Sequence, residues 1–245
     1  MAIAATKAYY DGTHDDQREQ ALTLSGVVAP ESLWTDFEKD WDNALAESHV
    51  YEDLHMRDLM HNKGYFADFS HQDKLELVGS LWNVFGRYRG TRLQAYSCSV
   101  LLPDYERAKK TIPNLREPEA MCVDFCAGGL QLTEEELSLP KPILLYFDRG
   151  EPFMHTINRV WEKATNGGTY FGTRRGWPYK ILNIIPANRS YSPIQAADLI
   201  AWSINRYRCT GDAIGQAFAT SALLMVQHYG RVYDYDEILS EYPNG

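Results

Sequence analysis

The most apolar strand candidate in the chain is KPILLYFD, residues 141–148, which the turn-forming sequence RGEP follows directly. A short continuous apolar run of this kind is typical of a strand buried on both faces of a sheet. A strand of that kind needs helices to cover it, and helical periodicity is present on both sides of it along the chain. The run therefore predicts an α/β fold in which helices flank a central sheet.

The remaining periodicities predict the order of the elements. We expect strands at 5–12, 20–30, 91–102, 141–148 and 179–187, with the first two forming a hairpin. We expect helices at 31–48, 73–88, about 117–130, 151–165, 193–208 and about 212–229. The glycines of AGGL are expected to end the helix over 117–130, and a polar tail is expected to follow the last helix. With no repeats and no low-complexity linker, this order predicts one domain over 1–245, with a core of about 5–210 and a C-terminal helix and tail over 211–245.

The composition is that of an ordinary globular protein, with 245 residues, 44% hydrophobic and 23% charged. No apolar run approaches the roughly 18 residues that a membrane span needs, and the N-terminus does not read as a signal peptide. The four cysteines are few for this length and are expected to be reduced, buried thiols, although zinc or a disulfide is the alternative. We therefore expect a cytoplasmic protein without a membrane partner; its oligomeric state is left open.

The net charge of −9 and the pI near 5.3 limit the ways in which this chain could act on nucleic acid. Non-specific coating of nucleic acid requires a basic surface, so the overall charge argues against it. An enzyme can still bind nucleic acid through a local basic patch and bound metal ions. The charge therefore restricts the mode of binding without excluding a nucleic-acid substrate.

One carboxylate stands out in the helix expected from YSPIQAADLIAWSINRYR, residues 191–208. Ser192 is expected to cap this helix, and Gln195 to complete a capping box. Asp198 then lies in or beside the apolar stripe, among small alanines and too far along the helix to be explained by its dipole. A half-buried carboxylate needs a partner, which a metal ion, Arg206 or a backbone amide could supply.

Two further aspartates are expected at the ends of strands. Asp11 follows the apolar pair YY, and Asp148 closes ILLYFD. In an α/β sheet, ligands gather at the carboxyl ends of strands, where Asp11, Asp148 and Asp198 would repel one another unless cations neutralised them. Mg²⁺ or Mn²⁺ suits such a cluster, and two such ions can activate water and stabilise the leaving oxygen in phosphodiester cleavage. The simpler alternatives are a turn beginning at Asp11 and an ion pair between Asp148 and Arg149.

At this point the chain resembles a known family. The first strand with Asp11, the stretches LTLSGVVAPESLWTDFEKDW and DLHMRDL, the strand ILLYFD and the helix PIQAADLIAWSINR together resemble the domain-of-unknown-function family 3800, over about residues 8–210. The resemblance implies a ribonuclease-H-like fold and a metal-dependent, nuclease-like site. It also implies that Asp11 lies on the first strand, Asp148 on a later parallel strand and Asp198 on the C-terminal helix.

The chain departs from this family at one position. The family opens with Asp-Glu-Ser-Gly, whereas this chain reads DGTHDD, so Gly12 stands where the Glu would be. Nearby carboxylates could replace it, and ribonuclease-H-like enzymes often take a further acid from the first core helix. The candidates for these two roles are Asp15, Asp16 and Glu19 in the loop, and Glu119 and Asp124 in the helix. Without a replacement the metal site is depleted.

Four further residues are candidates for roles beside the aspartates. His55 lies three residues before Asp58, so the two share a face if this segment is helical, and His55 would be a general acid or base or an ordinary half-exposed histidine. Lys63 would contact phosphate or be a solvated surface lysine. Arg174 and Arg175 lie among aromatics and glycines, which suits phosphate contact and base stacking or an ordinary surface loop.

Together these features give the hypothesis of a Mg²⁺- or Mn²⁺-dependent nuclease with a ribonuclease-H-like mixed central sheet flanked by helices. Its metal ligands would be Asp11, Asp148 and Asp198, with His55 as a helper. The first alternative is a catalytically inactive ribonuclease-H-like binding or regulatory module, which Gly12 favours. The second is a hydrolase of a small phosphorylated molecule, which the acidic charge suits better.

Overall fold

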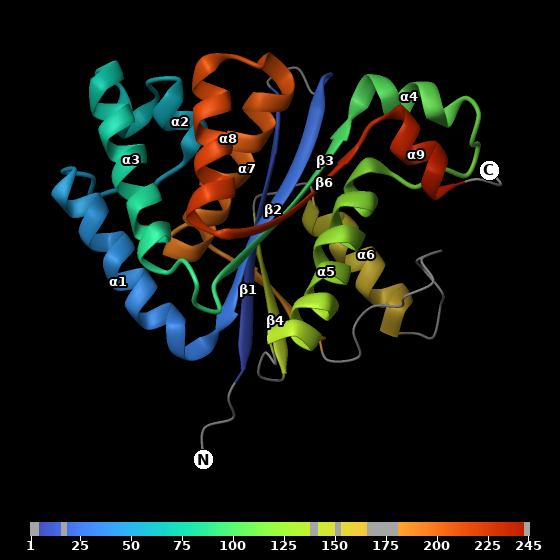
Figure 1. The fold of residues 1–245 in the computed structure, drawn as a ribbon, viewed down its shortest axis with the longest axis horizontal. Helices are drawn as coiled ribbons and strands as arrows, with labels where there is room; N and C mark the ends of the chain where they lie inside the picture. The colour runs from blue at the N-terminus through green and yellow to red at the C-terminus, as the bar shows by residue number, and fades with distance from the viewer. Residues whose placement is uncertain (1–4, 16–18, 138–141, 150–152, 166–180, 243–245) are drawn as a thin grey trace.

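In the described residues, six strands form a mixed sheet that runs through the middle of the molecule, between two layers of helices (Figure 1). The structure is a computed structural model, and it describes residues 5–15, 19–137, 142–149, 153–165 and 181–242. The strands are β1 (Thr6–His14), β2 (Ala21–Pro30), β3 (Gln94–Leu101), β4 (Ile143–Asp148), β5 (Ile181–Ala187) and β6 (Gln227–Tyr233). Their spatial order is β5-β4-β1-β2-β3-β6.

The strand directions define the fold. Strands β1, β2 and β3 pair antiparallel, while β4 runs parallel to β1, and β5 runs parallel to β4. Helices are inserted between β2 and β3, over residues 31–87. The predicted α/β fold, a mixed central sheet flanked by helices with helical insertions, is therefore confirmed.

The helices form one layer on each face of the sheet. On one face α7 (Ser192–Thr210) packs directly on β1 and β2, and α1 (Glu31–Glu47), α2 (Met56–Met60), α3 (His71–Arg87) and α8 (Ala213–Met225) surround it. A 3₁₀ turn, η1 (Gly64–Phe66), lies beside α2. On the other face lie α4 (Leu102–Lys109), α5 (Pro118–Leu137), α6 (Phe153–Thr165) and α9 (Tyr235–Glu241). Within the described part of the chain, no helix combines the length and apolar character that crossing a bilayer requires.

The alternation of side chains along two strands decides which face receives the aspartates. Tyr9 packs in the cluster around α7, and Tyr10 packs in the cluster around α5, where it stacks on Phe147 with ring centroids 4.8 Å apart. Because successive strand residues point to opposite faces, Asp11 and Asp148 both face α7. The aromatic pair on one face of the sheet therefore fixes the position of two carboxylates on the other.

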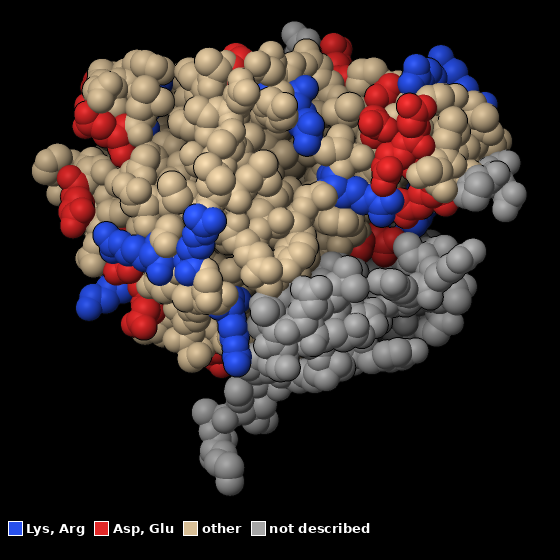
Figure 2. Space-filling view, in the orientation of Figure 1, with Lys and Arg blue, Asp and Glu red and all other residues tan. Residues whose placement is uncertain are grey.

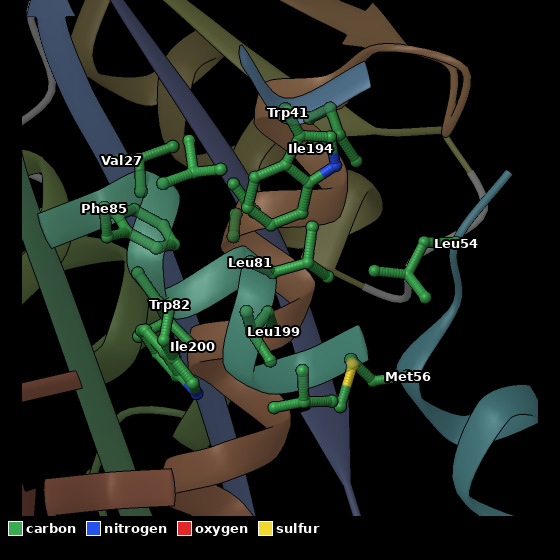
Figure 3. Packing of buried hydrophobic residues seen from close by; sticks show 14 of the residues in the cluster. Val27, Trp41, Leu54, Met56, Leu81, Trp82, Phe85, Ile194, Leu199 and Ile200 are labelled. Atoms are coloured by element: carbon green, nitrogen blue, oxygen red, sulfur yellow. The ribbon is translucent and has the colours of Figure 1, made fainter. Parts of the chain in front are cut away.

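Helix α7 is the most deeply buried helix for which side chains are described, with every residue over 192–205 buried. Its apolar side chains join those of α1 and α3, and Figure 3 shows Leu199 and Ile200 among Leu81, Trp82 and other residues of this cluster. Burial on this scale supplies the main stabilisation of the helix, because each fully buried large apolar side chain is worth roughly 1.5–3 kcal/mol. Its polar residues must therefore find partners inside the protein.

Two expectations about element ends are wrong. Strand β1 continues to His14, because β2 is long enough to pair with it throughout, so Asp11 lies within the strand opposite Ser25 rather than at its end. Helix α5 continues past AGGL to Leu137. Glycine costs only about 1 kcal/mol inside a helix, and the packing of Cys122, Cys126 and Leu130 against the sheet outweighs that cost.

The C-terminal segment also differs from the prediction of one helix over 212–229 and a polar tail. Helix α8 ends at Met225, and residues 227–233 form β6, which lies parallel to β3. Tyr229 stacks on Tyr96 of β3 at 5.2 Å, and Tyr233 is buried. These aromatic contacts favour a strand over a continued helix, so the expected tail contributes an edge strand to the sheet.

The close approach of β2 to a buried ring generates a stability prediction. A Cβ atom at Gly26 would lie 2.2 Å from two ring carbons of Tyr10, which is 1% exposed and held against Phe147. We expect G26A to lower the free energy of unfolding by about 1–3 kcal/mol, measured by denaturant titration.

The matched control is G79A on the exposed side of α3, where an added Cβ meets no atom within 4 Å. This variant should raise the free energy of unfolding by about 0.5–1 kcal/mol, since alanine favours a helix over glycine. Equal effects of the two substitutions would contradict the steric explanation for Gly26.

Candidate active site

Asp11 and Asp148 lie side by side at the carboxyl end of β4, where its parallel pairing with β1 stops. Tyr10 of β1 pairs with Phe147 of β4, and the two aspartates are the next residue along each strand. Neighbouring strands are about 4.8 Å apart, so the two side chains start from adjacent positions on the same face. Both are buried, at 2% and 4% exposure, and Asp11 Oδ1 accepts a hydrogen bond from the Gly12 N–H at 2.8 Å.

Asp198 reaches the same place from α7. It is 4% exposed, and its Oδ2 accepts a hydrogen bond from the backbone N–H of Met56 at 2.7 Å. The fully buried Ala197 and Ala201 are small enough to let the helix lie close to the sheet. The charge of Asp148 acts on Asp198, so the structure brings together the three aspartates that the sequence selected. Arg206, the alternative partner, pairs with Asp212 instead.

Arg189, which no sequence pattern pointed to, completes the charge cluster. It lies in the turn between β5 and α7, and its Nε donates a hydrogen bond to Asp148 Oδ2 at 2.9 Å. Burial lowers the pKa of Arg189, but the negative charges of Asp11, Asp148 and Asp198 outweigh this, so its pKa lies above the ordinary value. The guanidinium is therefore the built-in counter-ion of the three carboxylates.

The first turn of α7 holds Arg189 in place rather than capping the helix as expected. Tyr191 is the N-cap residue and makes no side-chain cap, while Ser192 already lies inside the helix. Gln195 accepts a hydrogen bond from Trp41 Nε1 at 3.1 Å and donates one to the carbonyl oxygen of Arg189 at 3.0 Å. The predicted capping box is therefore wrong, and Gln195 instead ties the turn to the core.

His55 approaches the aspartates from the segment before α2. Its Nδ1 lies 3.0 Å from Asp58 Oδ2, so the i,i+3 contact is present although His55 precedes the helix rather than lying in it. Its neighbours Leu54 and Met56 are 1% and 0% exposed, and Figure 3 shows them beside the packed core of α7. The charge of His55 acts directly on Asp198. Two buried neighbours thus fix a titratable ring next to the carboxylates.

The burial of Asp198 makes its charged form costly. Burial raises the pKa of this carboxyl group, and the charge of Asp148 acts in the same direction. His55, the Met56 N–H and Arg189 each oppose the shift, but they do not cancel it. A carboxylate in this state gains most from an additional cation nearby.

Lys63 belongs to a cavity whose lining includes none of the three aspartates. It lines this cavity, of about 380 Å³, together with other residues of the polar segment before α3, among them Glu52, Asp53, Asp58 and Tyr65. Three carboxylates on these walls make this cavity acidic rather than suited to a phosphate. Arg174 and Arg175 lie outside the described residues.

Of the loop candidates for the missing glutamate, Asp15 lies away from the three aspartates. Asp15 accepts hydrogen bonds from the backbone N–H groups of residues 19–21 and acts electrostatically on Cys209, near the end of α7. Cys209 lies eleven positions after Asp198 along the helix, which corresponds to about 16 Å. Glu19 is exposed, and Asp16 lies outside the described residues.

The two helical candidates lie on the opposite face of the sheet. Asp124 and Glu119 belong to α5, which packs on β2 and β3 away from α7. Asp124 pairs with Arg116 at 2.9 Å, and burial, which Arg116 opposes, raises its pKa to about 6. Neither residue reaches the three aspartates, so this expectation is not supported.

The residue types in the cluster fit a divalent cation, but one of the carboxylates, Asp148, is already paired with Arg189. Three carboxylates and one guanidinium leave an excess of negative charge, and carboxylate oxygens are the ligands that Mg²⁺ and Mn²⁺ prefer. In the part of the chain that the structure describes, however, no group of three or more His, Cys, Asp or Glu side chains stands ready to hold a metal ion. Asp148 accepts a hydrogen bond from Arg189, and Asp198 accepts one from the Met56 N–H.

Comparison with known proteins adds little to this geometry. No family model matches the chain, and no curated protein matches it. A chain in the solved structure of the PCNA:RNase HII complex from Archaeoglobus fulgidus is similar to 89% of this chain and 88% of its own length, with a TM-score of 0.39 and 12% sequence identity. The fold itself is defined by the strand order and directions given above, and the resemblance to family 3800 stays a prediction.

The raised pKa of Asp198 predicts how stability varies with pH. The folded protein holds this proton more tightly than the unfolded chain, so Asp198 stabilises the fold at low pH, and this stabilisation is lost as the pH rises through the raised pKa. D198N lacks the charge, and its amide oxygen still accepts from Met56. We expect the Tm of D198N to match that of the wild type near about pH 4 and to exceed it near about pH 8.

The gain in Tm should be about 2–4 °C for each kcal/mol of burial penalty and charge repulsion removed, measured by thermal unfolding across this pH range. D36N, at an exposed position of α1, is the matched control, and its Tm should follow that of the wild type at every pH. A D198N protein that is less stable than the wild type at high pH would contradict the assignment.

Proposed function

We propose that the protein hydrolyses phosphodiester bonds in nucleic acid, using Mg²⁺ or Mn²⁺ held by Asp11, Asp148 and Asp198. The observation that carries this proposal is the convergence of three buried carboxylates, with excess negative charge, at the carboxyl edge of parallel strands. That edge is where α/β sheets bind ligands. The resemblance to family 3800, with the ribonuclease-H-like fold that it implies, supports the same activity.

Divalent ions bound there would activate a water molecule and stabilise the leaving oxygen. The chain contributes the carboxylates from three separate elements, β1, β4 and α7, which the sheet and the buried helix hold rigidly. Rigid placement lowers the barrier by fixing the reacting groups before reaction. The raised pKa of Asp198 marks a site whose charge is incompletely balanced inside the protein.

His55 would move the proton. With its Nδ1–H donated to Asp58 Oδ2, the ring presents Nε2, which accepts a proton from water or, when protonated, delivers one to the leaving oxygen. Asp58 keeps the ring in this tautomer and orientation, as carboxylates do for catalytic histidines generally. Asp58 is therefore a positioning residue.

A nucleic-acid substrate would be held locally rather than by the whole surface. On the face shown in Figure 2, Lys and Arg side chains are scattered in small groups between large uncharged areas. This pattern agrees with the net charge of −9, which disfavours non-specific binding. We propose Arg174 and Arg175 as phosphate contacts, whereas the acidic cavity around Lys63 argues against that residue. We also propose a cytoplasmic setting, which the free thiols of all four cysteines support.

A second candidate is a catalytically inactive binding or regulatory module of the same fold. Gly12 removes one expected ligand, and the ion pair between Arg189 and Asp148 already neutralises part of the cluster. In this alternative the aspartates and Arg189 form a structural ion-pair network. The activity measurement below separates the two candidates.

We expect Mn²⁺-dependent cleavage of DNA, RNA or a hybrid by the wild type, measured on labelled substrates. D198N should lower the rate by roughly 100-fold or more, because losing a metal ligand costs more than losing a residue that supports one. D36N should cleave at the wild-type rate, since the same chemical change is made on an exposed surface. Cleavage that D198N leaves unchanged would overturn the mechanism, and inactivity on all three polymers would favour the inactive module.

The His55–Asp58 contact generates a separate kinetic prediction. D58N should lower kcat by about tenfold or more with little change in KM, because Asp58 orients His55. The measurement is steady-state cleavage at saturating Mn²⁺. D68N, at an exposed position nearby, is the matched control and should behave as the wild type; equal kcat in D58N and D68N would remove Asp58 from the mechanism.

A further inference from the structure

Arg189 is placed so that its backbone is fixed while its side chain reaches into the aspartate cluster. Its carbonyl oxygen accepts from Gln195 Nε2 at 3.0 Å, and Gln195 is 4% exposed and bonded in turn to Trp41. The Arg189 side chain is 33% exposed, whereas that of its partner Asp148 is 5% exposed. A long side chain on a fixed backbone, with one-third of its surface open to solvent, can leave its partner without the turn moving.

The electrostatic role of this side chain overlaps with the role proposed for the metal ion. Asp11, Asp148 and Asp198 all act on Arg189, and together they raise its pKa despite its burial. Its Nε donates a hydrogen bond to Asp148 Oδ2, which is one of the oxygens that a metal ion would need as ligands. A guanidinium and a divalent cation held at the same carboxylate oxygens repel each other strongly over such short distances.

We propose that Arg189 and the divalent cation are alternative counter-ions of the three aspartates, so that binding of the cation breaks the ion pair between Arg189 and Asp148. The released guanidinium stays tethered beside the site through Gln195, and its new partner is a phosphate oxygen of the substrate. This exchange rests on the proposed function for the identity of the substrate. It explains why the carboxylates converge although no ready metal arrangement is present among the described residues.

The first test is direct binding of Mn²⁺ to the purified full chain. Binding is measured by calorimetry and by the paramagnetic resonance signal of free Mn²⁺. We expect R189Q to bind Mn²⁺ at least about tenfold more tightly than the wild type, because a competing positive charge is gone. R189K keeps the charge without the fork-shaped contact, so its affinity should lie between the two. R206Q breaks the ion pair between Arg206 of α7 and Asp212, the residue before α8, and is the matched control, with wild-type affinity.

Thermal unfolding supplies a readout that does not depend on activity. Without Mn²⁺, R189Q should unfold at a lower temperature than the wild type, because three buried carboxylates lose their counter-ion. Added Mn²⁺ should raise the Tm of R189Q more than that of the wild type, since tighter binding stabilises the folded state further. R189K, which retains a positive charge, keeps the comparison available if R189Q does not fold without the ion.

The substrate half of the proposal is tested by steady-state cleavage at Mn²⁺ concentrations that saturate each protein. R189Q should raise KM for the nucleic acid severalfold with a smaller effect on kcat, and an unchanged KM would overturn the contact with phosphate. Mn²⁺ affinity in R189Q equal to or weaker than in the wild type would overturn the exchange of counter-ions. If the wild type cleaves nucleic acid but R189Q does not bind Mn²⁺ more tightly, the nuclease proposal holds and the exchange of counter-ions is wrong. If R189Q binds Mn²⁺ more tightly but no variant cleaves nucleic acid, the exchange holds and the nuclease proposal is wrong.

Discussion

The arrangement of this protein around α7 depends on how three buried carboxylates are neutralised. Asp11, Asp148 and Asp198 come from three elements far apart in the sequence, and unpaired charges at such depth would prevent those elements from packing. A guanidinium and two backbone N–H groups reach them, from Arg189, Gly12 and Met56. The turn before α7 and the segment before α2 are thus positioned by charge as well as by apolar contacts.

The parts of the fold that repeat a simple period could be predicted from the sequence. The apolar run before Asp148 indicated a buried strand, and the period of two along β1 and β4 places both aspartates on one face. Asp198 could be found because a charge in a buried helical stripe breaks the pattern around it, and such breaks are typical of functional sites. The boundary of β1 was misjudged, yet Asp11 still reaches the cluster, because its neighbour Tyr10, rather than the strand end, determines its place.

Other features have no local signature. Arg189 lies in a short turn without periodicity, and its partner is 41 residues away, so only the folded sheet shows that the two meet. Gln195 has the sequence of a capping residue, but a tryptophan on α1 competes successfully for its side chain. The identity of the metal, the metal ligands and the roles of Arg174 and Arg175 stay predictions, because they depend on groups that the sheet topology does not determine.

The edge of the sheet at β3 is covered by β6, a strand that comes much later in the sequence. Gln94 and Gln227 face each other across the sheet but are 133 residues apart in the chain. During synthesis, therefore, the antiparallel strands β1 to β3 emerge long before the strand that covers the outer edge of β3. An uncovered edge is a template for pairing with other chains. Until β6 has been synthesised, the outer edge of β3 therefore lacks the strand that covers it in the folded protein.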